Sequence, residues 1–315
     1  MDKNLRRYIR YILVLLITIS LVSYSIYFAY LAFVILLINS TRIFIRMKRR
    51  GKILPGKDNG LLFNAFNLDD YISSKGVNFT KSNNLEENFI IKEVFRKQNY
   101  SFTTDKPTVC IDIGANIGIT SIFFSTLPNV KKIYSFEPFK STYDKMLKNL
   151  DLNPKAKKLI KSFNYGLSDK KEDLMIDCNS NTPGCNSTVV NRYENFNDSF
   201  EKEKISLNVA SKDIKAILDN HKKEKIVLKI DTEGSEYKIL KDLNNSKLLK
   251  RVDCIMIEWH KLKGIKDASD TIMNPNFILD ILHKNGFVCF MQDGLVDIEF
   301  DKNYDYTGMI YGVRQ

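Results

Sequence analysis

A short apolar run that leads directly into glycines constrains the fold more than any other stretch of this chain. Residues 108–118 read TVCIDIGANIG. The part from Val109 to Ile113 predicts a strand buried on both faces, as in a parallel sheet. Residues 119–127 then place apolar side chains at helical spacing and end before Pro128. A strand, a glycine turn and a helix in this order bring the backbone against a nucleotide-like ligand.

The spacing of the glycines separates two cofactor classes. A dinucleotide site requires G-x-G-x-x-G, whereas here three residues separate Gly114 from Gly118, and Asn116 stands where the middle glycine would be. Asp112, at the strand end, would repel a pyrophosphate but suits the ammonium group of S-adenosylmethionine (SAM). Glu137 ends the next predicted strand, where a carboxylate accepts hydrogen bonds from both ribose hydroxyls. The pattern favours SAM over NAD, and a tight turn without a ligand is the alternative.

Three sequence blocks resemble the FkbM-type SAM-dependent methyltransferases. They are DIGANIG at 112–118, FEP at 136–138 and LKIDTEGSE at 228–236, and the resemblance covers roughly residues 88–313. It implies SAM as cofactor and a Rossmann-like class I methyltransferase fold, an α/β architecture with a mostly parallel seven-stranded sheet and helices on both faces. It leaves the acceptor open, because the family is diverse and acts mostly on hydroxyl groups of sugars and natural products.

The rest of the domain supports the same architecture, because predicted strands and helices alternate. A helix over 85–97 is expected to border the cofactor site. A polar insert, 168–206, is expected to overhang the acceptor site or to be a plain surface excursion. The other predicted elements are strands at 132–136, 158–164, 225–230 and 253–257, helices at 141–151, 214–220, 237–243 and 275–284, and a closing strand pair at 287–291 and 307–313.

Polar residues cluster where these strands end, which is where ligands bind in an open parallel sheet. Asp231 is the first candidate for removing the acceptor proton or anchoring the acceptor, and His260 is the second. A structural histidine at a strand end is the alternative for His260. The predicted cofactor-binding residues are Asp112, Gly114, Asn116, Gly118, Glu137, Tyr165 and Gly166, and the predicted catalytic residues are Asp231, His260 and Glu258.

Metal binding is the less favoured prediction. Glu233 and Glu236 could bind a divalent ion together with Asp231. Glu236 could equally favour a helix N-terminus, and no metal is predicted. The five cysteines show no metal spacing, and they are predicted to be free thiols.

An uncharged apolar segment precedes the domain. The stretch 11–41 spans 31 residues, and about 20 suffice to cross a bilayer. We predict a basic tail at 1–10, a single transmembrane helix at 11–41, a basic juxtamembrane segment and linker at 42–84, and a methyltransferase domain at 85–315. A re-entrant hairpin is the alternative, although no Gly or Pro marks a bend. More basic residues follow the segment than precede it, and SAM is made in the cytosol, so the domain is predicted to be cytoplasmic.

The charge distribution argues against a nucleic-acid partner. The formal net charge is +11, but residues 1–52 hold ten basic residues against one acid and therefore carry +9 of it. The basic character belongs to the flanks of the apolar segment. The sequence therefore predicts a membrane-anchored SAM-dependent methyltransferase that O-methylates a hydroxyl of a glycan or a lipid-linked saccharide. The alternatives are a lipid or protein acceptor, an inactive scaffold and, more remotely, a dehydrogenase.

Overall fold

The computed structural model describes residues 54–55, 72–73, 75–80, 85–178, 187–188, 201–262, 273–292 and 306–314. The predicted tail 1–10, the predicted membrane segment 11–41 and most of the linker 42–84 lie outside the described residues. Within the described ranges, no helix combines the length and the hydropathy that a membrane span needs.

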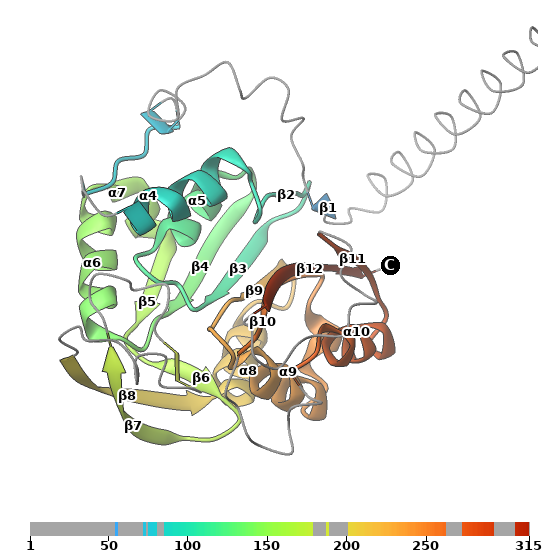
Figure 1. Ribbon diagram of the computed structural model, residues 1–315. Coiled ribbons are helices and arrows are strands. Elements are labelled where there is room, and N and C mark those ends of the chain that lie inside the picture. The colour runs from blue at the N-terminus through green and yellow to red at the C-terminus, as the bar shows by residue number, and fades with distance from the viewer. Residues whose placement is uncertain are drawn as a thin grey trace, which may run out of the picture. The chain divides into compact units, whose positions relative to one another are not determined.

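A seven-stranded sheet forms the centre of the described chain (Figure 1), in the order β11-β12-β10-β9-β3-β4-β5. Only β12 runs antiparallel to its neighbours; the other strands are parallel to one another. The predicted Rossmann-like, mostly parallel sheet is thus confirmed. The strands are β3 (Thr108–Ile113), β4 (Val130–Phe136), β5 (Ile160–Phe163), β9 (Lys225–Ile230), β10 (Cys254–Lys261), β11 (Phe287–Met291) and β12 (Tyr306–Arg314).

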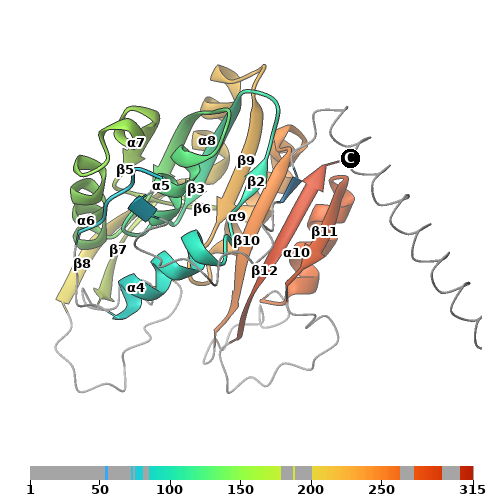
Figure 2. The ribbon, with the colours of Figure 1, turned by 90° about the horizontal axis from the view of Figure 1, so that it is seen from above.

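Helices cover both faces of this sheet (Figure 2). One face packs on α8 (Ala210–Asn220), α9 (Glu236–Asn245) and α10 (Pro275–Lys284). The other face packs on α5 (Ile119–Thr126), α6 (Lys140–Asp151), α7 (Pro154–Leu159) and the π-helix η1 (Lys92–Arg96), which continues α4 (Leu85–Ile91). A short 3₁₀ helix, η3 (Leu248–Arg251), follows α9.

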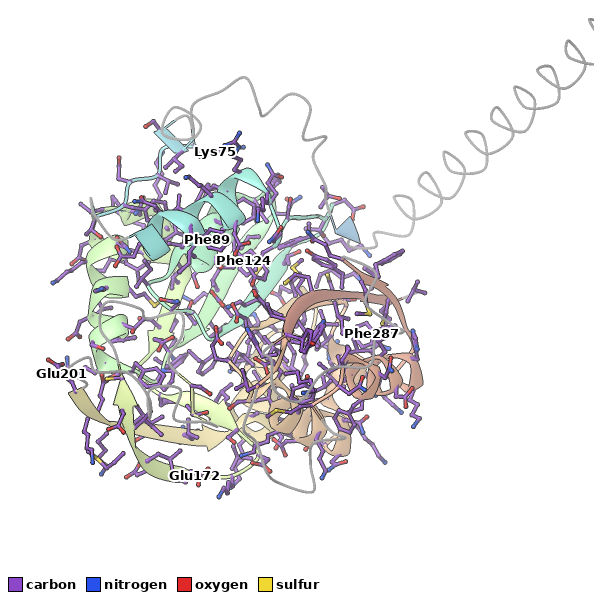
Figure 3. All side chains as sticks on the ribbon, viewed as in Figure 1. Lys75, Phe89, Phe124, Glu172, Glu201 and Phe287 are labelled. Atoms are coloured by element: carbon purple, nitrogen blue, oxygen red, sulfur yellow. The ribbon has the colours of Figure 1, made fainter. Side chains whose placement is uncertain are left out.

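Alternation along the strands distributes side chains between the two faces. In β3, Val109, Ile111 and Ile113 join the core on the side of α8 to α10, whereas Cys110 joins the opposite core. The α5 side contains large buried aromatic rings such as Phe124 (Figure 3). Asp112 and Lys229 point to this α5 side as well, and the register of β3 and β9 makes them direct cross-strand neighbours.

Two small sheets complete the described structure. β1 (Leu54–Pro55) pairs with β2 (Phe102–Thr103). The polar insert forms a three-stranded sheet of β6 (Gly166–Ser168), β8 (Glu201–Val209) and β7 (Glu172–Cys178), in that spatial order. The long β7–β8 pairing is antiparallel.

Some predicted boundaries are wrong for local reasons. The strand predicted from residue 158 begins at Ile160, because Pro154 starts the short helix α7 just before it. Proline is favoured in a first helical turn, where its missing N–H has no helical partner to lose. The helix predicted at 85–97 is α-helical only up to Ile91 and continues as the π-helix η1, in which the Lys97 N–H donates to the Lys92 carbonyl. Cys110, Cys178, Cys254 and Cys289 are free thiols as predicted, and Cys185 lies outside the described residues.

Candidate active site

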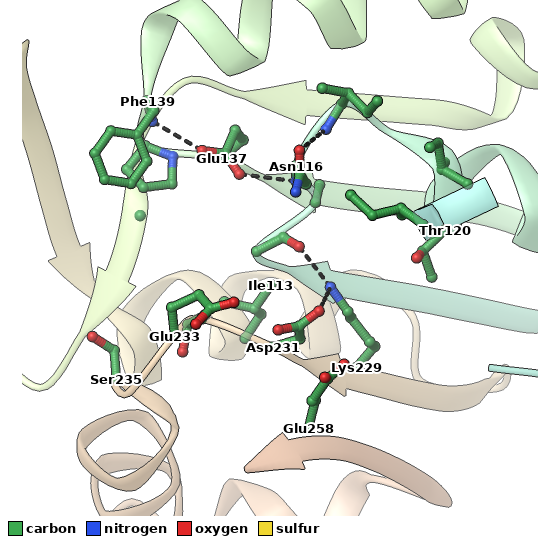
Figure 4. Close-up of a pocket in the computed structure, with 18 of the residues that line it drawn as sticks. Ile113, Asn116, Thr120, Glu137, Phe139, Lys229, Asp231, Glu233, Ser235 and Glu258 are labelled. Atoms are coloured by element: carbon green, nitrogen blue, oxygen red, sulfur yellow. Dashed lines mark hydrogen bonds and ion pairs between the residues drawn. The ribbon is translucent and has the colours of Figure 1, made fainter. Parts of the chain in front are cut away.

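An open cavity of about 220 Å³ lies at the carboxyl ends of β3, β4, β9 and β10 (Figure 4). This is the edge at which the sequence places the ligand, because strand ends in an open parallel sheet meet there. Six of the predicted site residues line it: Gly114, Asn116, Glu137, Gly166, Asp231 and Glu258. The other four, Asp112, Gly118, Tyr165 and His260, lie outside its lining.

The glycine turn between β3 and α5 forms one wall of the cavity. Gly114 has φ +79°, and a Cβ built on it would lie 1.7 Å from the carbonyl oxygen of Asp231. Only glycine therefore lets the turn approach the end of β9 this closely. Asn116 also has a positive φ, +51°, and its side-chain oxygen accepts a hydrogen bond from the Ile117 N–H at 2.7 Å. Gly118 instead packs against Met146 of α6, away from the cavity.

Glu137 is held in place by two backbone donors. Its Oε2 accepts from the Asn116 N–H at 2.9 Å, and its Oε1 accepts from the Phe139 N–H at 3.0 Å. The side chain is 5% exposed, and burial raises the pKa of its carboxyl to about 7 against the effect of these two bonds. The carboxylate thus joins the tip of β4 to the glycine turn and presents its remaining lone pairs at the cavity wall.

Asp112 lies beneath the glycine turn, which differs from the expected position. Its side chain is fully buried, its Oδ2 accepts from the Ser121 hydroxyl at 2.5 Å, and its Oδ1 lies 3.1 Å from the Lys229 ammonium. Burial raises the pKa of this carboxyl, although Lys229 acts in the opposite direction. The Asp112 carboxylate does not line the cavity, so the expected contact with a ligand ammonium is not formed from this position.

Lys229 connects this buried acid to Asp231 at the cavity. Its ammonium donates to the Gly114 carbonyl at 2.6 Å and lies 3.4 Å from Asp231 Oδ2. Burial alone would lower the pKa of Lys229, but the charges of Asp112 and Asp231 outweigh it and raise that pKa. A charged lysine at this position therefore fixes both the glycine turn and the Asp231 carboxylate.

Tyr100 bridges two predicted catalytic carboxylates and was not among the predicted site residues. Its hydroxyl lies 2.9 Å from Glu258 Oε2 and 3.3 Å from Asp231 Oδ2. Burial, followed by the negative charge of Asp231, raises the pKa of Glu258 to about 7. Nothing in the local sequence marks Tyr100, because it lies between η1 and β2 and reaches the cavity only in the folded chain.

His260 is enclosed by acids behind the cavity wall. Its Nδ1 lies 3.0 Å from Glu236 Oε1, and its Nε2 lies 3.5 Å from Glu233 Oε2. Burial would lower the pKa of the imidazole, but Glu233 and Glu236 outweigh this effect and raise it to about 10. An imidazolium at neutral pH cannot accept a proton, so this placement argues against His260 as the base and favours the structural alternative.

The Glu236 carboxylate accepts hydrogen bonds from the backbone of the loop before α9. It is fully buried and accepts from the N–H groups of Thr232, at 2.9 Å, and Gly234, at 3.0 Å. Asp231, Glu236 and His260 do offer ligand-type atoms within 4.8 Å of one another. The two ring nitrogens of His260 lie within ion-pair distance of Glu236 and Glu233, and Glu236 also accepts from the two backbone N–H groups. The arrangement therefore has the character of an ion-pair network.

Two parts of the polar insert meet this region. Gly166 lines the cavity, and a Cβ there would lie 2.7 Å from a Leu207 methyl group. Tyr165, a predicted cofactor-binding residue, instead donates its hydroxyl to Asp213 of α8 at 3.0 Å and does not line the cavity. Further along, Ser187 and Thr188 reach the loop that carries Glu233 and Ser235, through bonds of 2.6 and 2.7 Å. Thr188 also lines the cavity.

A Rossmann-like sheet with a strand-tip cavity, a glycine turn and a fixed acid after the second strand is the arrangement of proteins that bind a nucleotide-like cofactor. The Methyltransferase FkbM domain family matches residues 112–289, which is more than half of the chain. The chain belongs to this family, and the protein is a methyltransferase.

Curated relatives agree with this assignment. The chain is 26% identical over 231 residues to methyltransferase sdnD of Sordaria araneosa, covering 66% of this chain and 88% of that protein. It is also 26% identical over 194 residues to the hexuronic acid methyltransferase AglP of Haloferax volcanii, covering 58% and 68%. A solved FkbM methyltransferase from Methylobacillus flagellatus shares 14% identity, with 67% of this chain and 44% of that chain covered and a TM-score of 0.36. That structural likeness is too weak to carry an argument.

Proposed function

We propose that this methyltransferase uses SAM as methyl donor and O-methylates a hydroxyl group of a saccharide. The observation that carries the proposal is the presence of carboxylates on two opposite sides of one cavity. Glu137 stands at the cofactor side, and opposite it stand Asp231, directly after β9, and Glu258, in the second half of β10. The name of AglP, a hexuronic acid methyltransferase, supports a sugar acceptor.

The charge of the cavity fits SAM better than a dinucleotide. Glu93, Glu137, Asp231, Glu233 and Glu258 all line it. Among the described lining residues Lys229 is the basic one, and its ammonium is already engaged by Asp112, Asp231 and the Gly114 carbonyl, so a pyrophosphate would find little to neutralise it. A sulfonium cation suits such a surface, and Glu137 is positioned to accept hydrogen bonds from ribose hydroxyls.

The chain's own residues supply alignment and proton removal. When bound, SAM supplies an electrophilic methyl group on a positively charged sulfur. The acceptor hydroxyl is a poor nucleophile until its proton leaves, and Asp231 is the carboxylate that we assign to this step. Lys229 orients Asp231 from below. The Tyr100 hydroxyl can then take the proton from Asp231 while passing its own proton to Glu258, because it contacts both carboxylates.

The cofactor assignment predicts a selective loss of affinity when Glu137 is replaced by glutamine. We expect calorimetry of the full chain to detect SAM but not NAD, and Glu137→Gln to weaken SAM binding by about 1–3 kcal/mol through altered ribose hydrogen bonds. Glu201→Gln, at an exposed position on β8, is the matched control and should bind SAM normally. Equal affinity of Glu137→Gln and the parent chain would remove Glu137 from the cofactor site, and tight NAD binding would refute the cofactor class.

We further propose that residues 11–41 anchor the enzyme in a membrane as a single span, with the domain at 85–315 on the cytoplasmic side. The absence of charged residues from 11 to 41 and the basic flanks support this arrangement. Tethering would raise the local concentration of a lipid-linked saccharide acceptor.

The anchor can be tested by extraction of membranes with alkaline carbonate. The full chain should remain in the membrane pellet, and its domain should be cleaved only by protease that has access to the cytoplasmic side. Leu21→Arg combined with Ile26→Arg should release it, because each arginine at the centre of a span costs about 2.5–3.5 kcal/mol. Recovery of the parent chain in the soluble fraction would contradict the anchor.

A further inference from the structure

We propose that Phe89 and Glu93 on the α4–η1 helix form the acceptor subsite, and that the acceptor is an uncharged, hydroxyl-rich sugar ring rather than a uronic acid. This inference rests on the proposed function and specifies its substrate class. It comes from the shape, the exposure and the charge of one side of the cavity.

Phe89 gives this side of the cavity an unusual apolar surface. Its side chain is 55% exposed and yet lines the cavity (Figure 3 labels it), so its ring lies at the opening. The Lys97 ammonium lies 5.3 Å from the ring centroid and 3.0 Å from Glu93 Oε1, which holds the ring and the acid side by side. An exposed aromatic face beside polar groups is suited to cover the apolar C–H face of a sugar ring.

Phe89 and Glu93 lie on one continuous helix, which passes from α4 into the π-helical turn η1. Phe89 lies in the last turn of α4, and Glu93 lies in the π-helical turn η1 that follows. Residues four apart share a helix face, and Ile90 and Val94 line the cavity beside them. π-helical turns occur frequently at functional sites, which agrees with the position of this one beside the cavity.

The charges around the opening select against an anionic acceptor. Besides Glu137, four carboxylates line the cavity, those of Glu93, Asp231, Glu233 and Glu258. Three nearby cations are each already engaged by one of these carboxylates: Lys97 by Glu93, Lys229 by Asp231 and His260 by Glu233. Sugar hydroxyls can donate hydrogen bonds to the carboxylates, whereas a carboxylate on the acceptor would have to compete with them for these cations. The expected acceptor therefore differs in charge from the hexuronic acid that names AglP.

A matched pair of sugars tests this inference with the full chain and SAM. The methyl glycosides of glucose and of glucuronic acid differ only at C6, which is a hydroxymethyl group in the first and a carboxylate in the second. We expect the neutral glycoside to be methylated with a kcat/KM at least about tenfold higher, since like charges placed close together in a partly buried site repel each other by more than RT. Glu93→Gln should narrow this difference by weakening the repulsion.

Variants of the aromatic residue provide the second part of the test. Phe89→Ala should raise KM for the neutral glycoside about tenfold, through loss of the ring's apolar contact area, with SAM affinity unchanged. Phe290→Ala is the control, because Phe290 is similarly exposed, at 54%, but lies on β11 and does not line the cavity. Its KM should equal that of the parent chain.

The possible outcomes distinguish a failure of the acceptor subsite from a failure of the proposed function. Equal or better turnover of the glucuronide, turnover of neither glycoside despite SAM binding, or an unchanged KM in Phe89→Ala would each overturn the acceptor subsite. A SAM affinity lowered by Phe89→Ala would also overturn it, by assigning the ring to the cofactor. Failure of the parent chain to bind SAM would instead refute the proposed function itself.

Discussion

Replacing Asp231 with asparagine is expected to lower kcat/KM by about 10²- to 10⁴-fold, the usual contribution of a positioned general base. The asparagine side chain has nearly the same shape and keeps an oxygen for the Tyr100 hydroxyl, which lies 3.3 Å from Asp231 Oδ2. Stability and SAM affinity should therefore change little. Single-turnover methylation with radiolabelled SAM measures the effect, and full activity in Asp231→Asn would exclude Asp231 as the base.

The pH profile checks the same assignment independently. Glu258 must be ionised to receive the proton from Tyr100, and its pKa is raised to about 7. Activity should therefore fall as the pH drops through about 7 and reach its full value above it, because only the deprotonated form of Glu258 can accept the proton. The groups that face this proton path are Asp231, Lys229, Asp112, Glu93 and His260, with Thr307 Oγ1 at 3.4 Å from Glu258 Oε1. The pKa of Glu137 is also raised to about 7, so the profile of kcat is measured at saturating SAM, where cofactor binding no longer limits the rate. Under this condition Glu258→Gln should abolish the limb near pH 7, whereas a limb that persists in this variant would exclude Glu258 from the path.

Replacing Lys229 with methionine is expected to destabilise the domain by about 3–5 kcal/mol, because it leaves Asp112 as an uncompensated buried charge. Lys229 and Asp112 are only 2% and 0% exposed, and their charged atoms lie 3.1 Å apart. The loss is measured by urea unfolding of the full chain. Trp259 is the single tryptophan in the sequence and is fully buried in β10, so its fluorescence reports the unfolding of the sheet.

Two further variants identify the cause of that loss. Asp112→Asn combined with Lys229→Met should recover much of the stability, because the unpaired charge is then removed together with its partner. Lys241→Met, at an exposed position on α9, should unfold with the parent chain. A double variant no more stable than Lys229→Met alone would show that Lys229 stabilises the domain through its bond to the Gly114 carbonyl instead.

Much of the cavity could be located in advance, because strand ends are readable in a sequence. Glu137, Asp231 and Glu258 each follow or end an apolar, β-branched run, and parallel strands bring such ends to one edge of the sheet. Gly114 was recognisable for a similar reason, since a turn between a strand and a helix favours a residue that tolerates positive φ.

The side chains that were misplaced or missed depend on contacts between distant segments. The burial of Asp112 depends on Lys229 being its cross-strand neighbour, and register between parallel strands cannot be read from either strand alone. Likewise, the high pKa of His260 requires the loop containing Glu233 and Glu236 to fold around it. Tyr100 and Phe89 belong to segments that precede the sheet, and their apolar or aromatic character is equally typical of core positions.

The last described strand lies inside the sheet, and this affects how the chain can be made. β12 pairs with β10 on one side and β11 on the other, and the Arg314 guanidinium donates to the carbonyls of Leu249, Val252 and Asn285. A ribosome adds only about 5–20 residues per second. The edges of β10 and β11 that pair with β12 therefore stay unpaired while residues 292–314 are synthesised. The continuous sheet, and with it the outer support of the tip that carries Glu258, can close only after translation has passed residue 314.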